Sequence, residues 1–209
     1  MRTKAFRAVT VAAGVVGWSG VIDPRLPPRV QPVARAALGA VLVAATRAPL
    51  GLRPPQLWSG LRLGFAVAAP VILGVAASTA APAVRSAMAD RDLPDSASGW
   101  LAVRIPFGTV WSEEAAYRAA LGTMAAGAFG PTAGRLLQSV AFGLSHIADA
   151  RGTDEPVIAT VLVTAVAGWF FGLLLERSGS LAAPMLAHLA INEAGAVAAV
   201  AVQRRSATG

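Results

Sequence analysis

Two long apolar runs without any charged side chain constrain the fold of this chain more than any other feature. They span Leu63–Val84 and Pro156–Leu175. Each is about the 20 residues that a helix needs to cross the hydrocarbon core of a bilayer. The composition agrees, because 55% of the 209 residues are hydrophobic and only 14% are charged, whereas soluble domains are about 25% charged. The sequence therefore predicts an integral membrane protein.

Five further apolar stretches contain a few polar residues. We predict an all-α fold, a polytopic transmembrane bundle of about 6–8 helices, located in the cell (plasma) membrane. A basic start followed by an apolar run is typical of a signal peptide, but the later spans favour an uncleaved first span with a cytoplasmic N-terminus. The five stretches run from Ala8 to Ile22, Val33 to Leu50, Trp100 to Ala128, Leu136 to Ala148, and from the end of Ser178-Gly179-Ser180 to about Val202.

The charge and the missing cysteines exclude several classes of function. The net charge is +7, which in a membrane protein reflects Lys and Arg residues that flank the spans. We expect Arg35 and Arg47, near the ends of the second stretch, to extend toward the headgroups. No basic patch is interleaved with aromatic residues, so we expect no nucleic-acid partner. The chain has no cysteine, which excludes disulfides and thiolate catalysis.

The stretch from Trp100 to Ala128 contains an unusual charged motif, Glu113-Glu114 followed by Arg118. Glu114 and Arg118 are four residues apart, so they share one helix face and can pair, whereas Glu113 points toward a different neighbour. A solvated pair on an interfacial helix is the structural alternative. Ionisable residues at membrane depth are costly, and they are retained for function or for buried pairing.

The chain has two histidines. His146 lies in the stretch from Leu136 to Ala148, and His188 lies in the last stretch, which ends at about Val202. His146 follows Phe142 by four residues, and His188 precedes Asn192 by four residues. Each alone is explained by helix packing or by an interhelical hydrogen bond. Together with the carboxylates they supply the groups needed to hydrolyse an amide bond. A carboxylate near a neutral histidine can take a proton from water, and a histidine and a carboxamide can donate to a developing oxyanion.

The three patterns resemble the CPBP family of intramembrane proteases, which includes the CAAX prenyl endopeptidases and the Abi bacteriocin-immunity proteins. The family pattern is Glu-Glu-x-x-x-Arg, then Phe-x-x-x-His, then His-x-x-x-Asn or Asp. All three occur here in that order, as Glu113-Glu114 with Arg118, Phe142 with His146, and His188 with Asn192. The resemblance covers about Trp100–Val202.

The resemblance implies an intramembrane glutamic endopeptidase with its catalytic cavity inside the helix bundle. Glu113 would activate water with help from His146, and His188 with Asn192 would form the oxyanion site. Supporting roles would fall to Glu114, Arg118 and Phe142. The substrate would be a membrane-associated peptide or protein. The implied organisation is an N-terminal set of helices over residues 1–99, a catalytic core over 100–203 and a polar tail over 204–209.

Alternative interpretations remain open. Glu113, His146 and His188 offer ligands that zinc accepts, but the resemblance favours a mechanism without metal, so we expect no cofactor. A non-catalytic immunity or partner-binding protein could retain the same polar cluster for packing. A transporter is less favoured because the sequence has no repeated halves. A serine protease is less favoured because Ser145 is followed directly by His146. Glu193 fits none of the assigned roles.

Overall fold

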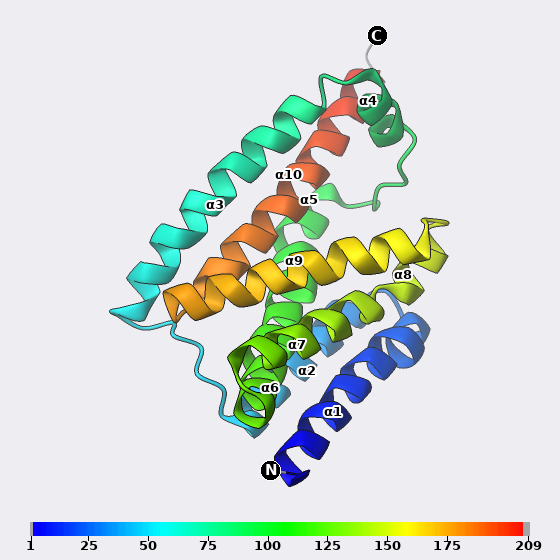
Figure 1. Ribbon diagram of the computed structural model, residues 1–209. Helices are drawn as coiled ribbons and strands as arrows, with labels where there is room; N and C mark the ends of the chain where they lie inside the picture. Colours follow the sequence, from blue (N-terminus) through cyan, green and yellow to red (C-terminus); the bar gives the residue numbers. More distant parts are fainter. Residues whose placement is uncertain (1, 207–209) are drawn as a thin grey trace.

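The computed structural model describes residues 2–206, a range that contains helices and loops but no β-strand. Figure 1 shows the helices gathered in one bundle, with the N-terminus and the C-terminus at opposite ends. The helices are α1 (Arg2–Gly17), η1 (Trp18–Ile22), η2 (Asp23–Arg25), α2 (Gln31–Thr46), α3 (Gln56–Ser78), α4 (Pro82–Ala89), α5 (Ala97–Gly99), η3 (Trp100–Trp111), η4 (Glu114–Leu121), α6 (Gly122–Phe129), α7 (Pro131–Ser145), α8 (Ile147–Gly152), α9 (Val157–Ser178) and α10 (Ala182–Ser206).

Four of these helical segments are long and apolar enough to cross a membrane. In the apolar windows of these four, between 17% and 28% of the residues are buried inside the protein. The remaining faces carry large exposed apolar side chains such as Phe65, Leu73 and Ile158, which lipid would cover. The prediction of a helical membrane bundle is therefore confirmed. The four segments are Arg2–Arg25, Gln56–Ser78, Val157–Ser178 and Ala182–Arg205, and α2 is a shorter apolar helix beside them.

The third predicted stretch has different boundaries in the structure. We expected it over Leu63–Val84, but α3 begins at Gln56 and ends at Ser78, and a separate helix, α4, follows. At the end of α3 the hydroxyls of Ser78 and Thr79 donate to carbonyls three residues earlier. Such side-chain bonds compete with the continuing backbone ladder. Pro82 then begins α4, where its missing N–H costs little.

One continuous helix, from Ala97 to Phe129, carries the charged motif. Two parts of it, η3 and η4, have π-helical hydrogen bonding. Pro106 removes one backbone donor from η3, and the Ser112 hydroxyl donates to the carbonyls of Gly108 and Thr109. Both effects loosen the α-helical pattern. Because π-helical segments occur frequently at functional sites, the position of Glu113 and Glu114 at the junction of η3 and η4 is informative.

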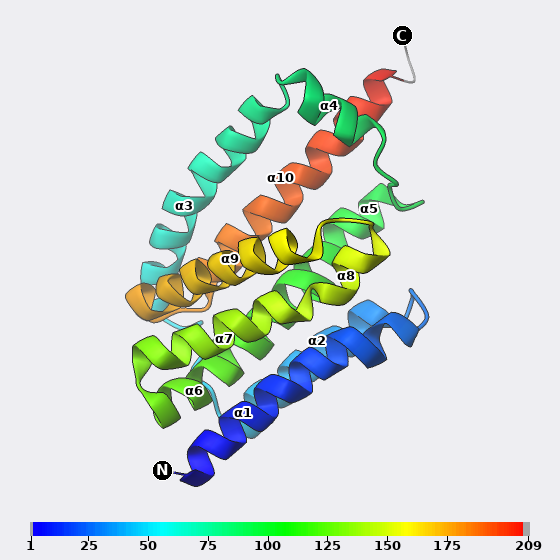
Figure 2. The ribbon, with the colours of Figure 1, turned by 45° about the vertical axis from the view of Figure 1, so that its right-hand side comes forward.

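Small residues let neighbouring helices of the bundle approach closely. A Cβ atom on Gly39 of α2 would lie 3.0 Å from the Ser112 carbonyl oxygen, and one on Gly64 of α3 would lie 2.8 Å from Leu186 of α10. Glycine at such crossings is typical of membrane bundles. Figure 2 shows α3 alongside α10 and α7 alongside α9. This packing brings the three polar motifs together in the interior.

Candidate active site

The centre of the bundle holds a buried ion pair between Glu114 and Arg118. The Arg118 Nε atom lies 3.3 Å from Glu114 Oε2, and both side chains are completely buried. The guanidinium carbon lies 3.8 Å from the ring centroid of Phe142 and 5.0 Å from that of Phe171. Guanidinium groups are attracted to such aromatic faces. The predicted contact between Glu114 and Arg118 is therefore present, and it is inside the protein rather than on a solvated face.

His188 connects this ion pair to Glu113. Its Nδ1 atom lies 2.8 Å from Glu114 Oε1, and its Nε2 atom lies 3.7 Å from Glu113 Oε2. Because a carboxylate only accepts, Nδ1–H is the donor to Glu114. The ring also stacks on Phe171, with centroids 4.9 Å apart. These contacts hold the imidazole so that its second nitrogen faces Glu113.

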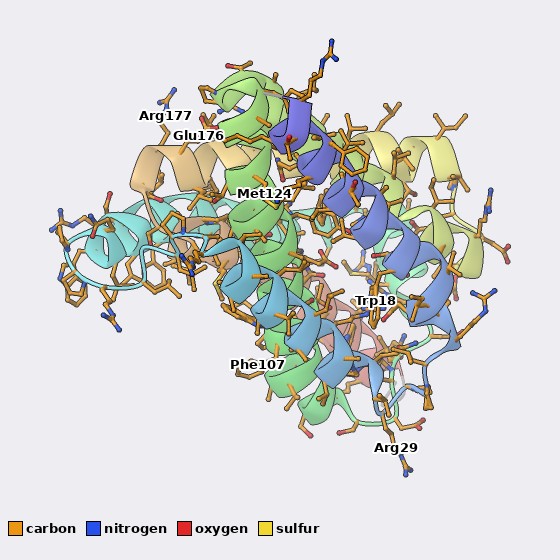
Figure 3. The ribbon with its side chains drawn as sticks, turned by 90° about the horizontal axis from the view of Figure 1, so that it is seen from below. Trp18, Arg29, Phe107, Met124, Glu176 and Arg177 are labelled. Atoms are coloured by element: carbon orange, nitrogen blue, oxygen red, sulfur yellow. The ribbon has the colours of Figure 1, made fainter. Side chains whose placement is uncertain are left out.

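Glu113 and His146 line one cavity of about 50 Å³. A buried water needs about 10–15 Å³ of such space, so several water molecules fit. The cavity lies where α1 and η1, α2, η4 and the end of α7 meet, and Figure 3 shows α1 and α2 passing beside the long central helix, with Trp18 near the end of α1. The structure thus brings together the two residues that were predicted to activate water.

His146 lies at the break between α7 and α8. Its Nδ1 atom lies 2.8 Å from the carbonyl oxygen of Phe142, and the Ser145 hydroxyl donates to the same oxygen. These side-chain bonds occupy an acceptor of the last turn, which favours the end of α7. Because a carbonyl only accepts, Nδ1 of His146 carries the proton in the neutral ring. Its Nε2 atom is then unprotonated, as a general base requires.

Asn192 and Phe142 have different surroundings. The Asn192 amide donates to the backbone oxygen of His188, 3.1 Å away. Asn192 and His188 are not part of the cavity lining. The oxyanion role of His188 and Asn192 therefore stays a prediction. The Phe142 ring contacts His146 and Arg118, with centroid distances of 4.7 Å to the imidazole and 3.8 Å to the guanidinium carbon.

The N-terminal helices contribute cavity residues that the sequence analysis missed. Asp23 of η2 and Arg35 of α2 both line the cavity. Arg35 Nε donates to Asp23 Oδ1 over 2.8 Å, and Arg35 Nη2 donates to Asp23 Oδ2. Arg35, which we expected to extend toward the headgroups, is thus paired and only partly exposed. Their spacing of twelve residues carries no helical-face signal, so only the fold brings them together.

Tyr117 and Asp149 complete the polar wall of the cavity. The Tyr117 hydroxyl lies 3.4 Å from the Ser19 hydroxyl. Burial raises the pKa of the Asp149 carboxyl, and the nearby charges of His146 and Arg35 oppose that rise. The sequence showed Asp149 only as the start of a charged loop. Its position three residues after His146 was the one local signal that it could share the site.

The arrangement of acidic and histidine side chains bears on the metal question. Within residues 2–206, no three or more His, Cys, Asp or Glu side chains form a group that could hold a metal ion. The zinc set considered from the sequence, Glu113 with His146 and His188, is therefore not assembled as a ligand cluster. Metal dependence stays a matter for experiment.

Comparison with known proteins adds the family. A family model described as type II CAAX prenyl endopeptidase Rce1-like matches residues 95–194. Residues 95–194, just under half of the 209 residues, are similar to this family. The match confirms the resemblance to the CPBP and CAAX proteases and includes all three motifs, so the chain is, at the level of the family, a membrane protease. No curated protein and no solved structure matches the chain. The Rce1-like match begins after α4, so the cavity residues from α1, η1, η2 and α2 lie outside it.

Proposed function

We propose that this protein is an intramembrane endopeptidase that hydrolyses a peptide bond in a membrane-associated peptide or protein, with water activated by Glu113 and His146. One observation carries the proposal: both side chains line a single water-sized cavity among membrane helices. The Rce1-like match supports the reaction class. The cell membrane is the location we propose.

Glu113 is the residue best suited to accept the proton from water. Its Oε2 atom is buried without a hydrogen-bond partner in the described part of the chain, and it lies 3.7 Å from His188 Nε2. A carboxylate with free lone pairs beside a water-sized space is a general base in position. The Nε2 atom of His146, left unprotonated by the bond to Phe142, is the second acceptor at the same cavity.

The reaction then proceeds in two steps. Water gives its proton to Glu113 with the assistance of His146, and its oxygen attacks the peptide carbonyl to form a tetrahedral intermediate. The C–N bond next breaks, the proton passes to the leaving amine, and a new carboxylate remains. We further propose that His188 and Asn192 stabilise the oxyanion, as preorganised donors do. For Asn192 this requires its amide to leave the His188 carbonyl. For His188 it requires a proton on Nε2 as well, because the proton on Nδ1 is donated to Glu114.

Proteoliposomes presented with a library of membrane-associated peptides test the proposal. The comparison is between the wild type, Glu113→Gln and His146→Ala. We expect each variant to lose about 10²–10⁴-fold in cleavage rate, which is the usual contribution of general acid–base catalysis. Glu193→Gln is the matched control, because Glu193 lies in α10 and does not line the cavity.

Two outcomes contradict the proposal. Retained cleavage in Glu113→Gln, with the control equally active, excludes Glu113 as the base. The second outcome combines two results: no peptide in the library is cut, and the effect of the protein in cells is the same for the wild type and Glu113→Gln. It supports the non-catalytic alternative, an immunity or partner-binding protein. Each assay is repeated with a chelator, and we expect no loss of rate. Loss on chelation that zinc restores would make the enzyme metal-dependent.

A further inference from the structure

A second polar cavity lies between α2 and η3 and shares only Arg35 with the lining of the catalytic cavity. It has a volume of about 70 Å³ and forms where the beginning of α2 meets η3. In Figure 3, Arg29 marks the chain just before α2. Polar side chains dominate the lining, which includes Gln31, Arg35, Trp100, Arg104 and Thr109. A polar hollow between membrane helices needs a polar occupant.

Arg104 is the free cation of this cavity. Its side chain is exposed, and within residues 2–206 it makes no hydrogen bond or ion pair. All five of its N–H donors are therefore available. Arginine without a carboxylate partner, at the edge of a polar hollow, is well suited to a planar two-point contact with phosphate.

Arg35 of α2 offers a second set of donors to the cavity. Its Nε and Nη2 atoms are committed to Asp23, whereas its Nη1 atom makes no hydrogen bond within the described residues. Asp23 is buried and balances the charge of Arg35. The charge of Arg104 is not balanced in this way, so the cavity is positively charged overall. No acidic side chain is part of the lining.

Gln31 and Trp100 shape the cavity wall rather than supply free donors. The Gln31 amide donates to the backbone oxygens of Asp23 and Leu26, which fixes the turn before α2. Trp100 lies under the guanidinium of Arg91, 5.9 Å from the ring centroid. Tryptophan and arginine together are typical of the level of the lipid headgroups.

We propose that this cavity is a phosphate-binding site, with Arg104 and the Nη1 atom of Arg35 as its donors. The phosphate comes from a lipid headgroup or from solution, and the chemistry of recognition is the same for both. The inference does not rest on the proposed protease activity, because it concerns a different cavity. Arg35 lines both cavities, which places the bound phosphate next to the wall of the catalytic one.

Binding measurements on the full chain in a neutral detergent test this inference. The probes are inorganic phosphate and a short-chain phosphatidylglycerol, each titrated at constant ionic strength with chloride as the reference anion. Thermal unfolding reports binding, because a ligand that binds only the folded state raises the unfolding temperature. We expect at least one probe to raise it, and we expect Arg104→Gln to weaken that binding about tenfold or more, the loss typical of a charge-assisted contact.

The control is Arg85→Gln, which removes another exposed arginine that lies on α4 and does not line the cavity. Stabilisation by phosphatidylglycerol alone, lost in Arg104→Gln, identifies a headgroup site. Stabilisation by inorganic phosphate as well identifies a site for free phosphate. Absence of stabilisation by both probes overturns the inference, as does equal stabilisation of the wild type and Arg104→Gln.

Discussion

Glu113 and Glu114 are neighbours in the chain but occupy different environments. The side chain of Glu114 is completely buried between Arg118 and His188, whereas that of Glu113 is 21% exposed and lines the cavity. The spacing of Glu114 and Arg118 predicted that these two residues could pair while Glu113 pointed toward a different neighbour, and the family resemblance implied their separate roles. The sequence could not predict that His188 would lie between the two carboxylates, because that contact joins residues 74 positions apart.

Removal of the buried carboxylate has a structural cost. We expect Glu114→Ala to destabilise the fold by about 3–5 kcal/mol, because it leaves the buried charge of Arg118 without its partner. Glu113→Ala leaves no buried cation unpaired and therefore costs much less. Thermal and denaturant unfolding in detergent measure both variants. Equal stability of Glu114→Ala and Glu113→Ala would contradict the assignment of Glu114 as a structural residue.

The partly desolvated carboxyl of Asp149, a residue that is exposed at the protein surface, makes stability depend on pH. Burial raises its pKa above the usual value, so the folded state holds this proton to a higher pH than the unfolded state does. The associated stability is fully present below the ordinary aspartate pKa, about 3.9, and is lost as the pH rises through the folded value.

Asp149→Asn cannot ionise and escapes this loss. We therefore expect it to gain stability relative to the wild type as the pH rises from about 4 to about 7. Unfolding temperatures of both proteins at the two pH values provide the measurement. A difference in unfolding temperature that stays constant or narrows with rising pH would show that the pKa of Asp149 is not raised in the folded state.

At the scale of the elements, the apolar runs predicted where helices lie but not where each begins and ends. The run Pro156–Leu175 agrees closely with α9, Val157–Ser178, because charged residues and a proline flank it. For α3 the prediction began too late, since Arg62 lies within the helix rather than before it. The π-helical segments η3 and η4 were not predicted, because the effects of Pro106 and of the Ser112 hydroxyl on the helix ladder are not visible in a hydropathy pattern.

The contact between α3 and α10 depends on Gly64. A Cβ atom there would lie 2.8 Å from Leu186 Cδ1 and 3.2 Å from the Cα of Ala183. We expect Gly64→Val to destabilise the protein by about 1–3 kcal/mol through overpacking. Gly74→Val is the control in the same helix, because a Cβ atom at Gly74 meets nothing within 4 Å. Similar unfolding temperatures for the two variants would show that α3 does not pack on α10 through Gly64.

At the scale of the whole molecule, the catalytic cavity is shared between the two halves of the chain. The three motifs of the Rce1-like match supply Glu113 and His146, while the helices before residue 95 supply Trp18, Asp23 and Arg35. The sequence predicted the first group from motif spacing. It could not predict the second, because those residues have no motif and reach the cavity only through the packing of α1 and α2.

The arrangement of the helices also predicts a topology. Figure 1 places the start of α1 and the helix α4 at opposite ends of the bundle. The basic N-terminus favours the cytoplasmic side, so α4 is expected on the other side. The chain has no cysteine, and Lys4→Cys and Arg85→Cys therefore give clean labelling sites. We expect an impermeant maleimide to label Arg85→Cys, but not Lys4→Cys, in intact cells. Labelling of both from the same side would contradict this topology.

The incorporation of oxygen from water tests the central claim most directly. Cleavage of a substrate in H₂¹⁸O, followed by mass spectrometry, reports whether water attacks the peptide carbonyl. We predict one ¹⁸O atom in the new carboxylate for the wild type and for Glu193→Gln, with a rate about 10²–10⁴-fold lower in Glu113→Gln. Cleavage in Glu113→Gln at the wild-type rate, or a product without ¹⁸O, would contradict water activation by Glu113.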